Sequence, residues 1–257
     1  MQWSSPAQLP LDLPAATGLA LAGCICLAGP ILLAFWWRRR TAVPLSAFGV
    51  GALVFFVSQV VLRFPWQIPL ARRVQEHPRL LVPFLIFSAL TAGIFEETGR
   101  WVGYRYLLRE RSRRTGVMMG LGHGGSESIL LVALPLLGLL GAWVLASRGM
   151  ITSGPALESV RRQTAQLDFW NVQLAALERA SSMATHVGLS LVVLQAWLRR
   201  SRRWLLLAIA LHFAVNVVGA TLVHQLGANA VLAELVVAAL AVGVLRFGWR
   251  LAEGNAA

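Results

Sequence analysis

Charged residues are scarce in this sequence. Of its 257 residues only 13% are charged, whereas 57% are hydrophobic. A soluble globular domain has about a quarter of its residues charged, so this composition excludes an ordinary soluble protein. The hydrophobic residues fall in blocks of roughly 20, which is the length that a helix needs to cross a bilayer. The sequence therefore predicts an all-α, polytopic membrane protein that is embedded in the lipid bilayer.

Lysine is absent, and cysteine nearly so. All 23 basic residues are arginines, and most lie at the ends of hydrophobic blocks, which is typical of topology signals and lipid-headgroup contacts. We therefore expect no nucleic-acid partner in spite of the net charge of +12. Cys24 and Cys26 lie two residues apart and point to different faces of a helix, which excludes a disulfide framework and a metal clip. No arginine precedes the first hydrophobic block, so we expect no cleavable signal peptide.

Seven hydrophobic segments are long enough to be membrane-spanning helices of one transmembrane domain, residues 1–257. They cover about residues 15–37, 43–62, 80–108, 115–147, 178–198, 204–223 and 229–247. The third and fourth exceed the usual length, so we expect them to be tilted, kinked or protruding, with Pro135 as a candidate kink. Over about residues 155–177, apolar residues recur at helical spacing opposite a polar face. This pattern predicts an amphipathic helix, and it favours an interfacial anchor over a gating lid.

The arginines are unevenly distributed between the two ends of these segments. Thirteen follow the first, third, fifth and seventh spans, and seven lie in the opposite loops. By the positive-inside rule, the N-terminus is expected outside and the C-terminus in the cytoplasm of a bacterial cytoplasmic membrane. Trp36, Trp197 and Trp249 lie beside the arginine-rich ends, as an aromatic belt requires. The 63–79 loop, with four arginines, is the exception to this pattern.

Ionisable residues occur inside four of the expected spans. An ionisable group at bilayer depth costs at least about 2.5–3.5 kcal/mol on insertion scales, so each is a candidate functional residue. Three lie in the run FEETGR, two in GLGHGGSES and one in HFAVN, and one is a solitary histidine. With the asparagine of HFAVN they form the candidate site: Glu96, Glu97, Arg100, His123, Glu127, His186, His212 and Asn216.

Counting residues from the arginine-rich ends gives these groups similar depths. His123 and His212 each lie nine residues from the nearest arginine cluster, about 13 Å from the cytoplasmic boundary. Glu96 and His186 lie 13 residues from theirs, about 18–20 Å. Structural ion pairs and interhelical hydrogen bonds would explain each residue singly, but they would not require this agreement. A shared site near the middle of the membrane is the better explanation.

Two adjacent carboxylates and several histidines are suited to activating water. A carboxylate beside a cation or a hydrogen-bond donor stays ionised and can take a proton from water. A His–Asn pair can donate hydrogen bonds to a developing oxyanion. We expect Glu127 to orient His123 rather than to react directly. The sequence has no HExxH and no convincing serine or cysteine nucleophile, so the set favours peptide hydrolysis by activated water.

These three sequence runs resemble those of the YhfC-type membrane peptidases. More distantly, they are similar to the CAAX-protease and bacteriocin-processing superfamily of glutamate-dependent intramembrane proteases. The resemblance extends from about the second span to the last. It implies that Glu96 is the water-activating base and that His212 and Asn216 stabilise the oxyanion. Glu97 and Arg100 match the rest of the first motif, and His123 falls where the superfamily has its second-motif histidine.

Three positions depart from the superfamily pattern. Arg100 lies one residue closer to the glutamate pair than in EExxxR, and Met119 stands where a phenylalanine is usual. His186 has no clear counterpart, and it is an alternative source of the second histidine. The role of each histidine therefore stays open.

Other functions and cofactors also stay open. A proton-coupled transporter could use a Glu–His relay, although no inverted repeat is evident. A non-catalytic immunity or scaffold protein could retain the site. The resemblance favours metal-free catalysis, and zinc held by Glu96, His123, His186 and His212 is the alternative. The expected substrate is a membrane-embedded or lipid-modified peptide, cut in the cytoplasmic half of the bilayer. The sequence predicts no oligomeric state.

Overall fold

The computed structural model describes residues 9–224 and 229–254, and every regular element in this part of the chain is a helix. Six of these helices are long and apolar enough to cross a membrane. Ser46–Val61 and Phe64–Glu76 form a pair bent by 48°, which makes a seventh span if the two are counted as one. The predicted all-α, polytopic fold is thus confirmed. The predicted orientation in the bilayer stays a prediction.

The chain forms two compact units. The first comprises Met1–Gly29 and Ser128–Leu177, and the second comprises Pro30–Glu127 and Glu178–Ala257. The single transmembrane domain expected from the sequence stays a prediction.

The first unit has a small apolar core of its own. This core contains Leu19, Trp143, Val160 and Val172, and van der Waals packing of such side chains holds membrane helices together. The elements that contribute to the unit are the first part of α1 (Leu13–Thr41), η3 (Ile129–Ala133), α6 (Leu134–Ser147), α7 (Gly154–Thr164) and the beginning of α8 (Phe169–Leu198).

The amphipathic helix predicted over residues 155–177 is shorter than expected. α7 ends at Thr164, and α8 begins at Phe169 rather than at residue 178. Asp168 separates the two helices, because its Oδ1 accepts a hydrogen bond from the backbone N–H of Asn171 at 2.8 Å and so caps the start of α8. The prediction was wrong because the apolar spacing is helical on both sides of this cap.

Pro135 coincides with an irregular turn in the fourth expected span. This span contains α5 (Arg113–Ser128), the π-helical turn η3 and α6, and Pro135 lies in the first turn of α6. Proline lacks an N–H group, and its ring crowds the preceding turn, so the regular hydrogen-bond pattern is interrupted there.

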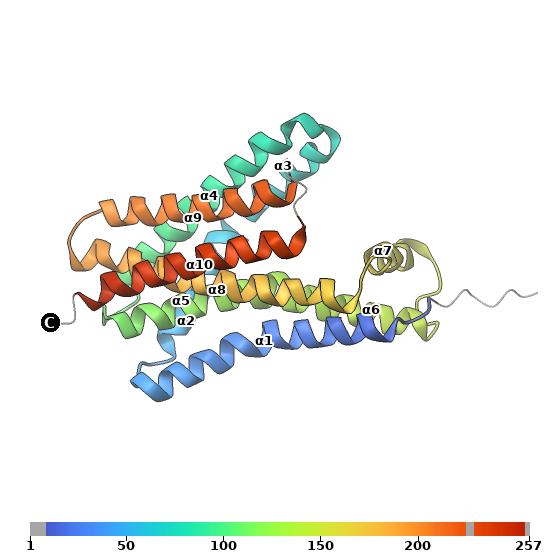
Figure 1. The fold of residues 1–257 in the computed structure, drawn as a ribbon, viewed down its shortest axis with the longest axis horizontal. Helices are drawn as coiled ribbons and strands as arrows, with labels where there is room; N and C mark the ends of the chain where they lie inside the picture. The colour runs from blue at the N-terminus through green and yellow to red at the C-terminus, as the bar shows by residue number, and fades with distance from the viewer. Residues whose placement is uncertain (1–8, 225–228, 255–257) are drawn as a thin grey trace, which may run out of the picture. The chain divides into compact units, whose positions relative to one another are not determined.

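The second unit contains every predicted site residue. In Figure 1, α4, α9 and α10 run side by side, with α4 in contact with α9 and α9 in contact with α10. Tyr104, Met118, Leu191 and Leu194 are fully buried in its core. Besides the last part of α1, α5 and most of α8, its elements are α2 (Ser46–Phe55), η1 (Phe56–Val61), α3 (Phe64–Glu76), η2 (Pro78–Leu80), α4 (Leu81–Tyr106), α9 (Arg203–His224) and α10 (Ala230–Glu253).

The segment 63–79, which the sequence suggested to be a loop, is largely helical. It contains α3 and η2, and a proline in the first turn of α3 favours a helix start at that position. The bend between η1 and α3 lies beside Arg63, whose side chain is only 6% exposed. Arg63 therefore does not act as the exposed topology signal suggested by its place in the sequence.

Glycines bring α5 close to its neighbours. A Cβ atom on Gly122 would lie 2.0 Å from the backbone oxygen of Phe48, in α2. A Cβ atom on Gly120 would lie 2.5 Å from Cα of Val187, in α8. Only glycine permits such close backbone approach, and small residues commonly serve this purpose in membrane helices. α5 is thereby held between α2 and α8, and this packing places His123 against α4.

Candidate active site

One turn of α4 supplies three of the site residues. Glu96 is 4% exposed, and Glu97 and Arg100 are completely buried. Nη1 of Arg100 forms an ion pair with Oε1 of Glu97, and Nη2 lies 3.9 Å from Oε2 of Glu96. The spacing of three and four residues places these side chains on one helix face. The cation thus lies beside two carboxylates that would otherwise be uncompensated in the membrane.

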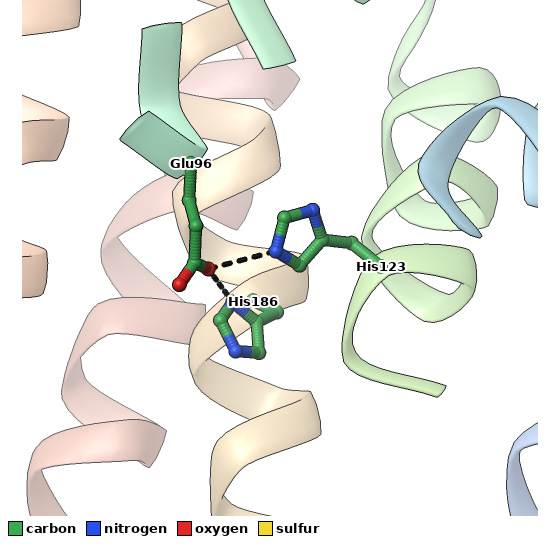
Figure 2. Close-up of side chains that lie close together, drawn as sticks. All are labelled: Glu96, His123 and His186. Atoms are coloured by element: carbon green, nitrogen blue, oxygen red, sulfur yellow. Dashed lines mark hydrogen bonds and ion pairs between the residues drawn. The ribbon is translucent and has the colours of Figure 1, made fainter. Parts of the chain in front are cut away.

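Three histidines from three other helices converge on the Glu96 carboxylate. Nε2 of His123 lies 2.8 Å from Oε2 of Glu96, and Nδ1 of His186 lies 4.0 Å from the same oxygen. Figure 2 shows both imidazole rings directed at this carboxylate. On its other side, Nε2 of His212 lies 4.0 Å from Oε1 of Glu96. All three histidines are at most 4% exposed, so this is an enclosed cluster of α4, α5, α8 and α9.

Glu97 holds His212 in place. Its Oε1 lies 2.7 Å from Nδ1 of His212 and also accepts from Arg100. An ionised carboxylate only accepts hydrogen bonds, so the proton of this pair is on Nδ1. In the neutral ring, Nε2 of His212 then presents a lone pair towards Glu96, and in the protonated ring it presents a second N–H group.

His186 is held from both sides. Nη2 of Arg100 lies 2.6 Å from Nδ1 of His186, and Oε2 of Glu127 lies 2.5 Å from Nε2. Arginine can only donate and an ionised carboxylate can only accept, so the ring carries its proton on Nε2. Glu127 in turn pairs with Arg179 at 3.0 Å. The expectation that Glu127 orients His123 was therefore wrong, because its carboxylate meets α8 instead.

Asn216 is the one predicted residue that the network does not include. It is half-buried on α9, one turn beyond His212. Within residues 9–224 and 229–254, its side chain makes no hydrogen bond. The structure thus brings seven of the eight candidate residues into one hydrogen-bonded network, while their catalytic roles stay predictions.

Two further residues, which lie outside the sequence motifs, belong to the cluster. Nε2 of Gln59, in η1, donates to Oε1 of Glu96, and Oε1 of Gln59 accepts from Nη1 of Arg63 at 2.6 Å. A glutamine inside an apolar span was the available signal for the first. Arg63 gave no such signal, because it lies at the end of its span, where arginines usually mark topology.

The charges of the network compensate one another. Removing one partner of a buried ion pair costs about 3–5 kcal/mol, because the remaining charge is left without compensation. Arg100 lies between Glu97 and His186, and Arg179 lies between Glu127 and Glu178. Each arginine therefore stabilises carboxylates that the bilayer would not tolerate alone.

The donor set fits a metal ion. Glu96, His123 and His186 each offer one ligand atom, and these atoms lie within 4.8 Å of one another. Two histidines and a glutamate form a recurrent ligand set of catalytic zinc sites. A carboxylate on the far nitrogen of His186 is the usual partner of a metal-binding histidine. One contact must change on binding, since Arg100 donates to the His186 nitrogen that faces Glu96.

Comparisons with known proteins identify the family of this chain. Residues 25–237 match the family described as YhfC intramembrane metalloprotease. The chain is 32% identical over 237 residues to a protein of Bacillus subtilis (strain 168) described as uncharacterized membrane protein YhfC, and the match covers 87% of this chain and 91% of the other. No solved structure matches.

The family match bears on three expectations from the sequence. It includes all eight candidate site residues, and it confirms the resemblance to YhfC-type proteins and the multi-pass membrane location. The family description names a metalloprotease, so the expectation of metal-free catalysis finds no support. The chain belongs to the YhfC intramembrane metalloprotease family.

Proposed function

We propose that this protein is an intramembrane endopeptidase that hydrolyses a membrane-embedded or lipid-modified peptide at the Glu96 cluster. The observation that carries this proposal is that nitrogen atoms of three buried histidines lie within 4.0 Å of one buried carboxylate. Peptide hydrolysis needs a polar group that activates water inside an otherwise apolar environment. The description of the family supports the same reaction class.

We further propose that the site works with a divalent metal ion such as Zn²⁺, held by Glu96, His123 and His186. His212 is a fourth donor, because its Nε2 faces Glu96. When bound, such an ion polarises the scissile carbonyl and makes a water molecule more acidic. Glu127 and Glu97 orient the rings of His186 and His212 through their far nitrogens.

In a metal-free site, Glu96 itself would be the base, as the wider superfamily resemblance implies. His123 donates to one Glu96 oxygen, and Gln59 donates to the other, which favours the ionised carboxylate that a base requires. His212 would then stabilise the oxyanion only in its protonated form, because Glu97 accepts the proton on Nδ1. The Asn216 amide, which lies one turn further along α9, is the other donor proposed for that step.

The test uses the purified protein in proteoliposomes with membrane-embedded reporter peptides, and products are identified by mass spectrometry. Glu96→Gln is expected to abolish cleavage, while Glu253→Gln, which changes an exposed carboxylate, is expected to retain it. Cleavage by Glu96→Gln at the wild-type rate would refute the role of Glu96. Proton or solute uptake without any cleavage would instead indicate a transporter.

Metal removal separates the two forms of the proposal. Elemental analysis is expected to find a divalent metal in the purified protein, and a chelator is expected to abolish cleavage that added Zn²⁺ restores. Full activity after complete removal of metal would leave Glu96 as the base of a metal-free enzyme.

A further inference from the structure

A buried amide reaches the Glu96 carboxylate from η1, a π-helical turn that the sequence motifs do not include. Gln59 is 3% exposed, and its Nε2 donates to Oε1 of Glu96. The other oxygen of Glu96 lies 2.8 Å from His123. Both oxygens of the carboxylate are therefore engaged, one by the histidine and one by the glutamine. π-helical turns inside α-helical spans are frequent at functional sites.

Arg63 connects Gln59 to α4. Its Nη1 donates to Oε1 of Gln59 at 2.6 Å, and its Nη2 donates to the backbone oxygen of Ser88 at 2.7 Å. Its Nε donates to Oγ1 of Thr91 at 3.3 Å. In the described part of the chain, no carboxylate oxygen lies within salt-bridge distance of Arg63, although the side chain is buried. A buried cation that contacts only neutral acceptors is costly, so simple ion pairing does not account for it.

Hydrogen-bond polarity explains what this arrangement accomplishes. A glutamine amide has two orientations of similar shape, and only one of them presents N–H groups to Glu96. The guanidinium of Arg63 can donate but not accept, so it requires the carbonyl oxygen of Gln59 on its own side. The amide nitrogen must then face Glu96. Without Arg63, the amide could turn and place its oxygen against the carboxylate.

We propose that Gln59 and Arg63 are positioning residues of the Glu96 site. Arg63 holds the Gln59 amide in one orientation, and the Gln59 amide holds one carboxylate oxygen of Glu96 in place. The functional part of this inference rests on the proposed peptidase activity. Neither residue needs to touch the substrate, since both act through the placement of the Glu96 carboxylate.

The decisive variant is Gln59→Glu, compared with Gln59→Leu. The carboxylate introduced by Gln59→Glu keeps the size of the side chain and its bond to Arg63, but it presents an oxygen to Glu96 instead of an N–H group. Both variants are expected to lower kcat about 10- to 100-fold, the usual effect of losing the partner that orients a catalytic ligand, with KM unchanged. If Gln59 only held Arg63 in the fold, Gln59→Glu would keep wild-type kcat, and this result would overturn the proposal.

A double-variant cycle tests the link through Arg63. Arg63→Met is expected to lower kcat in the wild type but to add no further loss in the Gln59→Leu background, because the two residues act in series. Losses that multiply would contradict the inference. Gln67→Leu is the matched control: Gln67 is a second glutamine near Arg63, and its Nε2 donates to Oγ of Ser88 at 2.6 Å, whereas among the described residues it forms no hydrogen bond with Gln59. It is expected to leave kcat unchanged.

A stability measurement tests whether Gln59 acts on the Glu96 carboxylate, even if the wild-type protein cleaves no peptide. Gln59→Leu is expected to lower the midpoint of unfolding in detergent when Glu96 is present, because a buried carboxylate oxygen loses its donor. In a Glu96→Ala background, the same substitution is expected to have much less effect. Equal losses in both backgrounds would show that Gln59 does not act on Glu96. Absence of cleavage by the wild type would refute the peptidase assignment alone.

Discussion

At the scale of single residues, the site is defined by the protons of its imidazole rings. Arg100 donates to one nitrogen of His186 and Glu127 accepts from the other, so this ring has a single orientation and tautomer. Glu97 does the same for His212 from one side. The groups around the histidines thus determine which lone pairs face Glu96, and these lone pairs are what a metal ion or a proton would use.

Loss of the Glu127 carboxylate should therefore affect the site although Glu127 does not touch Glu96. Glu127→Gln is expected to lower both metal affinity and kcat about 10- to 100-fold. The reason is that Nε2 of His186 would lose the charged carboxylate that accepts its hydrogen bond and fixes the ring. The measurements are metal content at a controlled free Zn²⁺ concentration and cleavage in proteoliposomes. Glu178→Gln is the control, since Glu178 pairs with the same Arg179 but forms no bond with His186 in the described part of the chain. Equal effects of the two variants would show that only the charge around Arg179 matters.

Several of these contacts could be expected from the residues, and others could not. The depth of Glu96, His123 and His212 follows from counting along helices, and the structure places these side chains together. The pairing of Glu127 with His186 does not follow from counting, because it depends on the rotation of α5 and α8 about their axes. Asn216 matches a motif, but among the described residues its side chain makes no hydrogen bond to the network, so the motif alone did not determine its environment.

At the scale of helices, glycines decide how closely α5 approaches its neighbours. Phe48 of α2 and Val187 of α8 lie directly against glycine backbone of α5. His123 lies within this stretch, and its ring contacts Phe55 edge-on with 5.4 Å between ring centroids. Any separation of α5 from α2 or α8 would move His123 away from Glu96, so the packing of this helix and the geometry of the site are coupled.

A single methyl group should therefore be enough to disturb α5. Gly122→Ala is expected to destabilise the protein by about 1–3 kcal/mol or more, because the added Cβ atom overlaps the backbone of Phe48. Gly141→Ala in α6 is expected to have no such cost. Within the described residues, nothing beyond the neighbouring backbone of α6 lies within 4 Å of the added Cβ atom, and alanine favours a helix over glycine by roughly 0.5–1 kcal/mol. Unfolding in detergent measures both variants. Equal stability changes of the same sign would refute the close-packing argument.

Helix boundaries show where local patterns were insufficient. The amphipathic spacing continues from α7 into α8, so the break at Asp168 was missed even though aspartate is a favoured helix cap. The helix α3 was missed for a different reason, since four arginines in residues 63–79 suggested an exposed loop. In both cases a local hydrogen bond or bend took precedence over the average polarity of the segment.

At the scale of the whole molecule, arginine and tryptophan mark the ends of the spans. Arg105 lies over the ring of Trp197 at 5.2 Å, and Arg113 lies over the ring of Trp249 at 4.9 Å. Such cation–π pairs suit the interface between headgroups and hydrocarbon, where the ring is partly apolar and the cation stays hydrated. These residues lie at the arginine-rich ends, which the positive-inside rule assigns to the cytoplasm.

The orientation is testable by cysteine labelling of intact cells. In a background with Cys24 and Cys26 replaced by alanine, a membrane-impermeant thiol reagent is expected to label Ser153→Cys. The same reagent is expected to label Ser201→Cys only after the cells are opened, because the arginine-rich end faces the cytoplasm. The reverse labelling pattern would invert the assigned topology. Labelling of both positions in opened cells controls for accessibility.

The sequence by itself determined that this protein resides in a membrane, because its hydrophobic residues form blocks long enough to cross one. It also predicted about seven spans and a similar depth for the ionisable residues, because distance along a helix is proportional to residue number. Only the tertiary structure decided which nitrogen faces which oxygen, that Glu127 serves His186, and that Gln59 and Arg63 reach Glu96. Those contacts depend on how helices rotate and bend against one another, and packing between distant segments sets that geometry.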